Sequence, residues 1–152
     1  MAFLFPEGRH EKIAAMAKAI SLENFQRTVR IAAALVFAAS AAVLYVGGAQ
    51  PVAVGLFPAP WDKLAHLLTF AVVGMAAGVA GGMRGWRMVM CCLAGALLVG
   101  GMDELHQVFL PGRSASWADL ATDAAGGLLG AAALAVLHRL AGERFTQSLK
   151  HR

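Results

Sequence analysis

The sequence predicts an all-α membrane protein, a bundle of four transmembrane helices with both termini in the cytoplasm. Apolar residues make up 59% of the 152 residues and charged residues only 14%, a composition too apolar for the interior of so short a soluble domain. The apolar residues fall into four blocks, each near the length needed to cross about 30 Å of hydrocarbon. Basic residues are concentrated in alternate connecting segments, which defines an orientation.

The first apolar block covers residues 29–48 and follows a charged segment, residues 1–28. We expect the charged segment to be cytoplasmic. Ile13, Met16 and Ile20 share one helical face within it, a pattern that indicates a helix lying on the inner membrane surface.

The remaining three blocks cover residues 64–82, 86–102 and 120–137. Together with the first block they define a transmembrane domain over residues 29–138. A basic cytoplasmic tail, residues 139–152, completes the chain.

A tryptophan stands near the start of each of these three blocks, at Trp61, Trp86 and Trp117. Indole rings favour the membrane–water interface, where they fix the depth of a helix. The tryptophans therefore support the predicted block boundaries.

Glycines recur at four-residue spacing in two of the blocks, as Gly74, Gly78 and Gly82 and as Gly126 and Gly130. This spacing places glycines on one helical face and lets helix backbones approach closely. We expect these glycines to serve helix packing.

The orientation of the bundle follows from the distribution of Lys and Arg. Eleven of the thirteen basic residues lie in or at the edges of the N-terminal segment, the second loop and the C-terminal tail, and only Lys63 and Arg113 lie in the first and third loops or at their edges. Because cytoplasmic loops carry the excess of basic residues, the termini are predicted to be cytoplasmic. The basic residues form no stripe on a soluble domain, so nucleic acid is not an expected partner.

Polar residues gather on the opposite, outer side of this topology, including five of the nine acids. Several are three or four residues apart and so share a helix face. Ionisable groups that face lipid are costly, so we expect these faces to meet in one shallow site open to the outside. The candidate binding residues are Asp62, Lys63, His66, Glu104, Gln107, Arg113, Ser116, Asp119 and Asp123.

Structural roles can explain some of these residues. Asp62 can cap the helix that it precedes, and Ser116 with Asp119 fits the capping-box pattern of a helix start. His66 stands about one turn into a span, so it needs a polar partner, which a structural hydrogen bond can supply.

Glu104 is the strongest candidate for a functional carboxylate, and Arg113 in the following loop is its expected ion-pair partner. Asp103, His106 and Ser114 lie beside these residues. We expect those three to be ordinary solvated neighbours.

The polar motifs stand in a fixed order along the chain: Asp62-Lys63-x-x-His66, Glu104-x-x-Gln107, Pro111-Gly112-Arg113-x-x-Ser116-x-x-Asp119 and Gly126-x-x-x-Gly130. In combination they resemble the VanZ-like family, named for the teicoplanin-resistance protein VanZ, over about residues 60–130. The resemblance implies a multi-pass protein of the bacterial inner membrane, in some members linked to lower teicoplanin susceptibility. This chain has Asp123 where family members often carry Asn.

Two functions are compatible with the outer polar site. The first is binding or modification of a cell-envelope component, a lipid or a peptide, at the membrane surface. The alternative is a membrane-embedded enzyme acting on a phosphate-bearing, lipid-linked envelope precursor, with Lys63 and Arg113 holding the phosphate. His66 and Glu104 are then the candidate catalytic residues for proton transfer.

A third interpretation is a divalent-metal site. Imidazole and carboxylate ligands at His66, Glu104, Asp119 and Asp123 suit zinc or manganese, although their spacing matches no metal-binding motif. We predict no cofactor, and the expected partners are the lipid bilayer and an envelope ligand.

Overall fold

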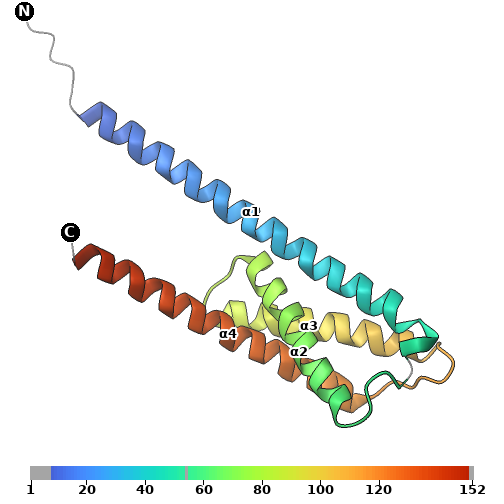
Figure 1. Ribbon diagram of the computed structural model, residues 1–152. Coiled ribbons are helices and arrows are strands. Elements are labelled where there is room, and N and C mark those ends of the chain that lie inside the picture. The colour runs from blue at the N-terminus through green and yellow to red at the C-terminus, as the bar shows by residue number, and fades with distance from the viewer. Residues whose placement is uncertain (1–7, 54, 151–152) are drawn as a thin grey trace, which may run out of the picture.

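The computed structural model describes residues 8–53 and 55–150, and this part of the chain contains helices and no strand. The four α-helices are each long and apolar enough to cross a membrane, which confirms the predicted all-α fold with four spanning helices (Figure 1). A short 3-10 helix follows the first of them. The elements are α1 (Gly8–Gly48), η1 (Pro51–Ala53), α2 (Trp61–Gly81), α3 (Trp86–Gln107) and α4 (Trp117–Lys150).

The tryptophans are the first residues of three helices. Trp61, Trp86 and Trp117 begin α2, α3 and α4, and each indole is more than half exposed. Side chains that project from the helix starts in this way are suited to the polar interface of a bilayer. The helix starts thus coincide with the predicted ones to within a few residues.

Helix α1 continues without a break from the N-terminal charged segment into the first apolar block. Its 41 residues correspond to a length of roughly 60 Å at 1.5 Å per residue, about twice the thickness of the hydrocarbon core. Figure 1 shows the N-terminal half of α1 and the C-terminal half of α4 extending beyond α2 and α3 at the same end of the molecule. The position of the N-terminal segment on the membrane surface stays a prediction.

Helix α4 lies against α2 through its glycine face. A Cβ atom added at Gly130 would collide with the carbonyl oxygen of Ala71, and one added at Gly126 would lie 2.6 Å from the carbonyl oxygen of Leu67. Only glycine allows this separation of the two backbones, as the four-residue spacing predicts. Gly74 of α2 faces Gly127 of α4 in the same way.

Gly82 differs from the other glycines of the repeat. It has a φ of +62° and ends α2 as a left-handed C-cap, so its role is to terminate the helix and not to pack against another one. The Arg30 side chain of α1 lies over it and donates a hydrogen bond from Nε to the carbonyl oxygen of Ala80 at 3.1 Å. Arg30 thereby attaches α1 to the end of α2.

The core is formed by small and medium side chains from α2, α3 and α4. One cluster consists of Phe70, Val73, Ala96 and Val99, and a second consists of Met88, Cys92, Ala131 and Leu134. Helix α1 covers the first cluster with Phe37, Ala41 and Leu44.

Candidate functional site

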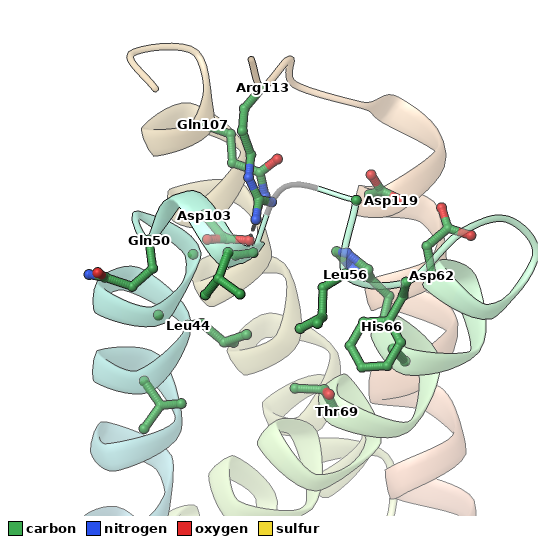
Figure 2. Close-up of a pocket in the computed structure, with 18 of the residues that line it drawn as sticks. Leu44, Gln50, Leu56, Asp62, His66, Thr69, Asp103, Gln107, Arg113 and Asp119 are labelled. Atoms are coloured by element: carbon green, nitrogen blue, oxygen red, sulfur yellow. Dashed lines mark hydrogen bonds between the residues drawn. The ribbon is translucent and has the colours of Figure 1, made fainter. Parts of the chain in front are cut away.

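The predicted polar residues converge at one end of the bundle, which carries the α1–α2 and α3–α4 loops and is called the loop end below. They surround a pocket of about 650 Å³. The pocket is open between the C-terminal end of α1, the start of α2, the end of α3 and the two loops (Figure 2). It is therefore built from segments that are distant in the sequence.

The two sides of the pocket differ in character. Val43, Leu44, Leu56 and Phe57, from α1 and the following loop, form an apolar wall. The facing side is polar and comes from α2, α3, α4 and the α3–α4 loop. Its polar lining residues are Asp62, His66, Thr69, Asp103, Gln107, Arg113, Ser114 and Asp119.

Lys63 joins the start of α2 to the start of α4. Its Nζ lies 3.1 Å from Oδ2 of Asp62 and also donates a short hydrogen bond to Asp119. The expected capping role of Asp62 is wrong, because Pro60 is the N-cap of α2 and no side chain caps that helix start. A carboxylate in the first turn is instead favoured by the partial positive charge of the helix N-terminus.

His66 has the polar partner that its position requires. Its Nδ1 lies 2.8 Å from Oδ1 of Asp123 on α4, and Asp123 is fully buried. The imidazole also stacks on Phe70, with ring centroids 5.9 Å apart. His66 is therefore held from two sides while it lines the pocket.

Glu104 binds the start of α4, and the expected ion pair between Glu104 and Arg113 is not formed. The Glu104 carboxylate instead accepts a hydrogen bond from the backbone N–H of Ser116 through Oε2. The Ser116 hydroxyl accepts one from the backbone N–H of Asp119 at 3.2 Å. The capping box is thus completed by a glutamate from α3, which leaves the Asp119 carboxylate available to Lys63.

This contact makes a prediction for stability. Glu104→Ala removes the acceptor for a part-buried backbone N–H, which is expected to lower the free energy of unfolding by about 1–3 kcal/mol. Glu104→Gln keeps an acceptor oxygen at the same position and should lose less than about 1 kcal/mol. Thermal unfolding in detergent measures both values, and equal losses for the two variants would contradict a role for the Ser116 hydrogen bond.

Asp103 belongs to the pocket, so the expectation that it is a solvated neighbour is wrong. It is 9% exposed, and its Oδ2 accepts a hydrogen bond from Nε2 of Gln107 at 2.8 Å. The two residues are four apart on α3, the same spacing that predicted the other polar pairs. The four-residue spacing between Asp103 and Gln107 could have identified Asp103 as a site residue. The predicted motif instead placed Gln107 on a helix face with Glu104, three residues away.

His106 also differs from a solvated neighbour, whereas Ser114 is exposed. The His106 ring stacks on Tyr45 of α1, with centroids 3.8 Å apart and an interplanar angle of 16°. Ser114 lines the pocket. The ring stack packs the C-terminal ends of α1 and α3 together beside the pocket.

The nine predicted site residues thus form two groups, those that line the pocket and those that support them. Asp62, His66, Gln107, Arg113 and Asp119 line the pocket. The other four hold those residues or their helices in place by hydrogen bonds. These supporting residues are Lys63, Glu104, Ser116 and Asp123.

The four candidate metal ligands, His66, Glu104, Asp119 and Asp123, form no metal-binding group with one another. Among the described residues, no three side chains of His, Cys, Asp and Glu are grouped closely enough to hold a metal ion. Instead, His66 and Asp123 are joined to each other, Glu104 accepts from the backbone of Ser116, and Asp119 accepts from Lys63.

The fold and the site together define a multi-pass membrane protein with a polar pocket at one end of four helices. The VanZ/LLP1 family model matches residues 2–138, so the chain belongs to the VanZ/LLP1 family. This match extends the resemblance seen over about residues 60–130 to include the first helix. No curated protein and no solved structure matches the chain.

Proposed function

We propose that the protein binds an amphiphilic component of the bacterial cell envelope in the pocket at its loop end. One observation carries the proposal: a single pocket has an apolar wall on one side and charged side chains on the other. An amphiphile presents the same two surfaces, a hydrocarbon chain and a polar head. An amphiphile can therefore contact the apolar wall with its hydrocarbon chain and the charged side chains with its polar head.

The dimensions of the pocket support this ligand class. Its volume of about 650 Å³ lies within the range of small-molecule sites, roughly 300–1,000 Å³. That volume accommodates a headgroup and the first part of an acyl chain. The rest of the chain extends into the bilayer, because the pocket is open.

The proposal places the pocket at the outer surface of the inner membrane. Among the described residues, ten of the thirteen basic residues lie in the first part of α1, in the α2–α3 loop with the start of α3, and in the last part of α4, at the end opposite the pocket, and positive segments favour the cytoplasm. The N-terminal end of α1 and the C-terminal end of α4 lie at the same end of the molecule (Figure 1). Both features support cytoplasmic termini.

The test is to measure which lipids stay bound after mild purification, by native mass spectrometry. Gly47 lines the pocket and has open space beside it, so Gly47→Phe should fill the pocket and reduce lipid retention by roughly tenfold or more. Gly101→Phe is the matched control, because Gly101 also has open space beside it but does not line the pocket. Equal retention by the two variants would reject the pocket as the binding site.

The same pair of variants tests a link to glycopeptide susceptibility, which the family resemblance suggests. If the bound component is a cell-wall precursor or controls access to one, a bacterial host producing the wild-type protein should differ in teicoplanin susceptibility from a host producing Gly47→Phe. Gly101→Phe should behave as wild type. Measuring the minimum inhibitory concentration decides this point independently of lipid retention.

Acid–base catalysis on a phosphate-bearing, lipid-linked precursor is the second candidate function. It is favoured by the His66–Asp123 hydrogen bond, in which a buried carboxylate orients an imidazole that lines the pocket. A carboxylate holding Nδ1 leaves Nε2 to exchange a proton with a bound molecule. Incubation of purified protein with such precursors should then release product, and His66→Gln should abolish the release.

A further inference from the structure

We infer that the ligand of the pocket has a zwitterionic headgroup, with an ammonium bound by Asp103 and an anionic phosphate or carboxylate bound by Arg113. This inference rests on the proposed binding function and specifies the class of ligand. Its basis is a pair of opposite charges in the pocket that have no ionic partner among the described residues.

Asp103 supplies the anionic half of the site. Its side chain is more than nine-tenths buried, and Oδ2 is occupied by Gln107. Oδ1 is buried without a hydrogen-bond partner and lies beside Gly48, where an added Cβ would be 3.5 Å away. Asp103 and Gly48 both line the pocket, so this carboxylate borders the space that a ligand would occupy.

A buried carboxylate oxygen without a donor is costly, because it has lost the hydrogen bonds that water would give it. An ammonium removes this cost, since it carries three donors and a positive charge. Neutral hydroxyl donors give weaker hydrogen bonds than charged ones. Asp103 therefore selects for a cation at this position.

Arg113 supplies the cationic half. It lines the pocket, forms no ion pair in the described part of the chain, and its Nε is buried without a partner. Figure 2 shows its side chain pointing into the pocket on the side where Asp103 and Gln107 lie. A guanidinium presents several donors in one plane, which fits the oxygens of a phosphate or a carboxylate.

The other charged groups of the loop end already have partners. Lys63 contacts both Asp62 and Asp119, Glu104 accepts from Ser116, and Asp123 is joined to His66. Glu104 does not line the pocket, so Asp103 and Arg113 are the charged pocket-lining residues that have no ionic partner in the described part of the chain.

The overall charge of the loop end favours a zwitterion over an anion. Five carboxylates stand there against two basic side chains, so a ligand that carries only negative charge is repelled. A ligand that carries only positive charge leaves Arg113 without a counter-ion. A zwitterion satisfies both groups.

The experiment measures the affinity of the purified full-length protein for short-chain lipids below their micellar concentration. Phosphatidylethanolamine carries an ammonium and a phosphate, phosphatidylglycerol carries only the phosphate, and lysine acylated on its α-nitrogen carries an ammonium and a carboxylate. We expect at least one zwitterionic probe to bind about tenfold more tightly than phosphatidylglycerol. The better of the two zwitterions identifies the anionic group as phosphate or carboxylate.

Two variants assign the charges. Asp103→Asn keeps an acceptor for Gln107 and should weaken zwitterion binding about tenfold without weakening phosphatidylglycerol binding. Arg113→Gln should weaken binding of all three probes. Thr122→Ala is the control, because the Thr122 hydroxyl donates to the carbonyl oxygen of Ala118 in its own helix and does not line the pocket, and its affinities should equal those of wild type.

The outcomes separate this inference from the proposed function. If wild type binds phosphatidylglycerol as tightly as both zwitterions, the zwitterion inference fails while lipid binding stands. If Asp103→Asn weakens all probes equally, the assignment of Asp103 to the ammonium fails. If no probe binds to wild type, and purification with mild detergent retains no lipid, the proposed function itself fails.

Discussion

Replacing Gly126 with alanine is expected to lower the free energy of unfolding by about 1–3 kcal/mol, the usual cost of overpacking a close contact. An added Cβ would lie 2.6 Å from the carbonyl oxygen of Leu67 and 3.0 Å from the backbone nitrogen of Ala71. Both neighbours are backbone atoms of α2, so they cannot move aside as a flexible side chain can. Helices α2 and α4 must separate, which also weakens the packing around Phe70.

Gly101→Ala is the matched control for this prediction. Gly101 lies in α3 and has no atom within 4 Å of an added Cβ, so alanine should raise stability by about 0.5–1 kcal/mol through its better helix propensity. Unfolding of both variants in mixed micelles, followed by circular dichroism, gives the two free energies. The same change in stability in both variants would show that the α2–α4 contact does not determine the result.

The sequence predicted the four helices well, because the length of an apolar block depends only on the thickness of the membrane. It also predicted that glycines spaced by four residues bring helices together. It did not predict which helices meet, since spacing within one helix contains no information about its partner. Gly82 was grouped with the packing glycines, but its positive φ makes it a helix terminator, and a backbone dihedral angle cannot be recognised from spacing.

Within the candidate site, the convergence of the polar faces could be predicted and the individual pairings could not. Polar faces avoid lipid, so they turn toward one another, and the pocket contains residues from α2, α3, α4 and the α3–α4 loop. Arg113 was assigned to Glu104 because it follows nearby in sequence. The path of the loop determines that Glu104 meets the backbone of Ser116 instead.

Asp103 illustrates a different limit of the sequence. Asp103 and Glu104 are adjacent acids at the end of the same apolar block, and hydropathy alone does not distinguish them. Both are buried in the structure, because they project toward different neighbours: Asp103 toward Gln107 and Gly48, Glu104 toward Ser116. Adjacent helical residues point about 100° apart, so the two carboxylates serve different contacts.

The second large effect is expected from His66→Ala. This change removes the partner of Oδ1 of Asp123, whose other oxygen, Oδ2, is already buried without a hydrogen bond. A fully buried carboxyl group would then have no partner, and the free energy of unfolding should fall by about 2–4 kcal/mol. The measurement is unfolding in detergent, with circular dichroism of the unheated variant as a check of helix content.

A double-mutant cycle distinguishes this cause from the loss of imidazole packing on Phe70. Adding Asp123→Ala to His66→Ala removes the unpartnered carboxyl group, so the double variant should be more stable than His66→Ala alone. Asp123→Asn should retain most of the wild-type stability, because its amide oxygen can still accept a hydrogen bond from Nδ1 of His66. Additive losses in the double variant, to within about 0.5 kcal/mol, would mean that His66 acts mainly through its ring contact. A clear recovery would instead show that the buried acid depends on the imidazole, and that His66 is held toward the pocket by a hydrogen bond within the core of the bundle.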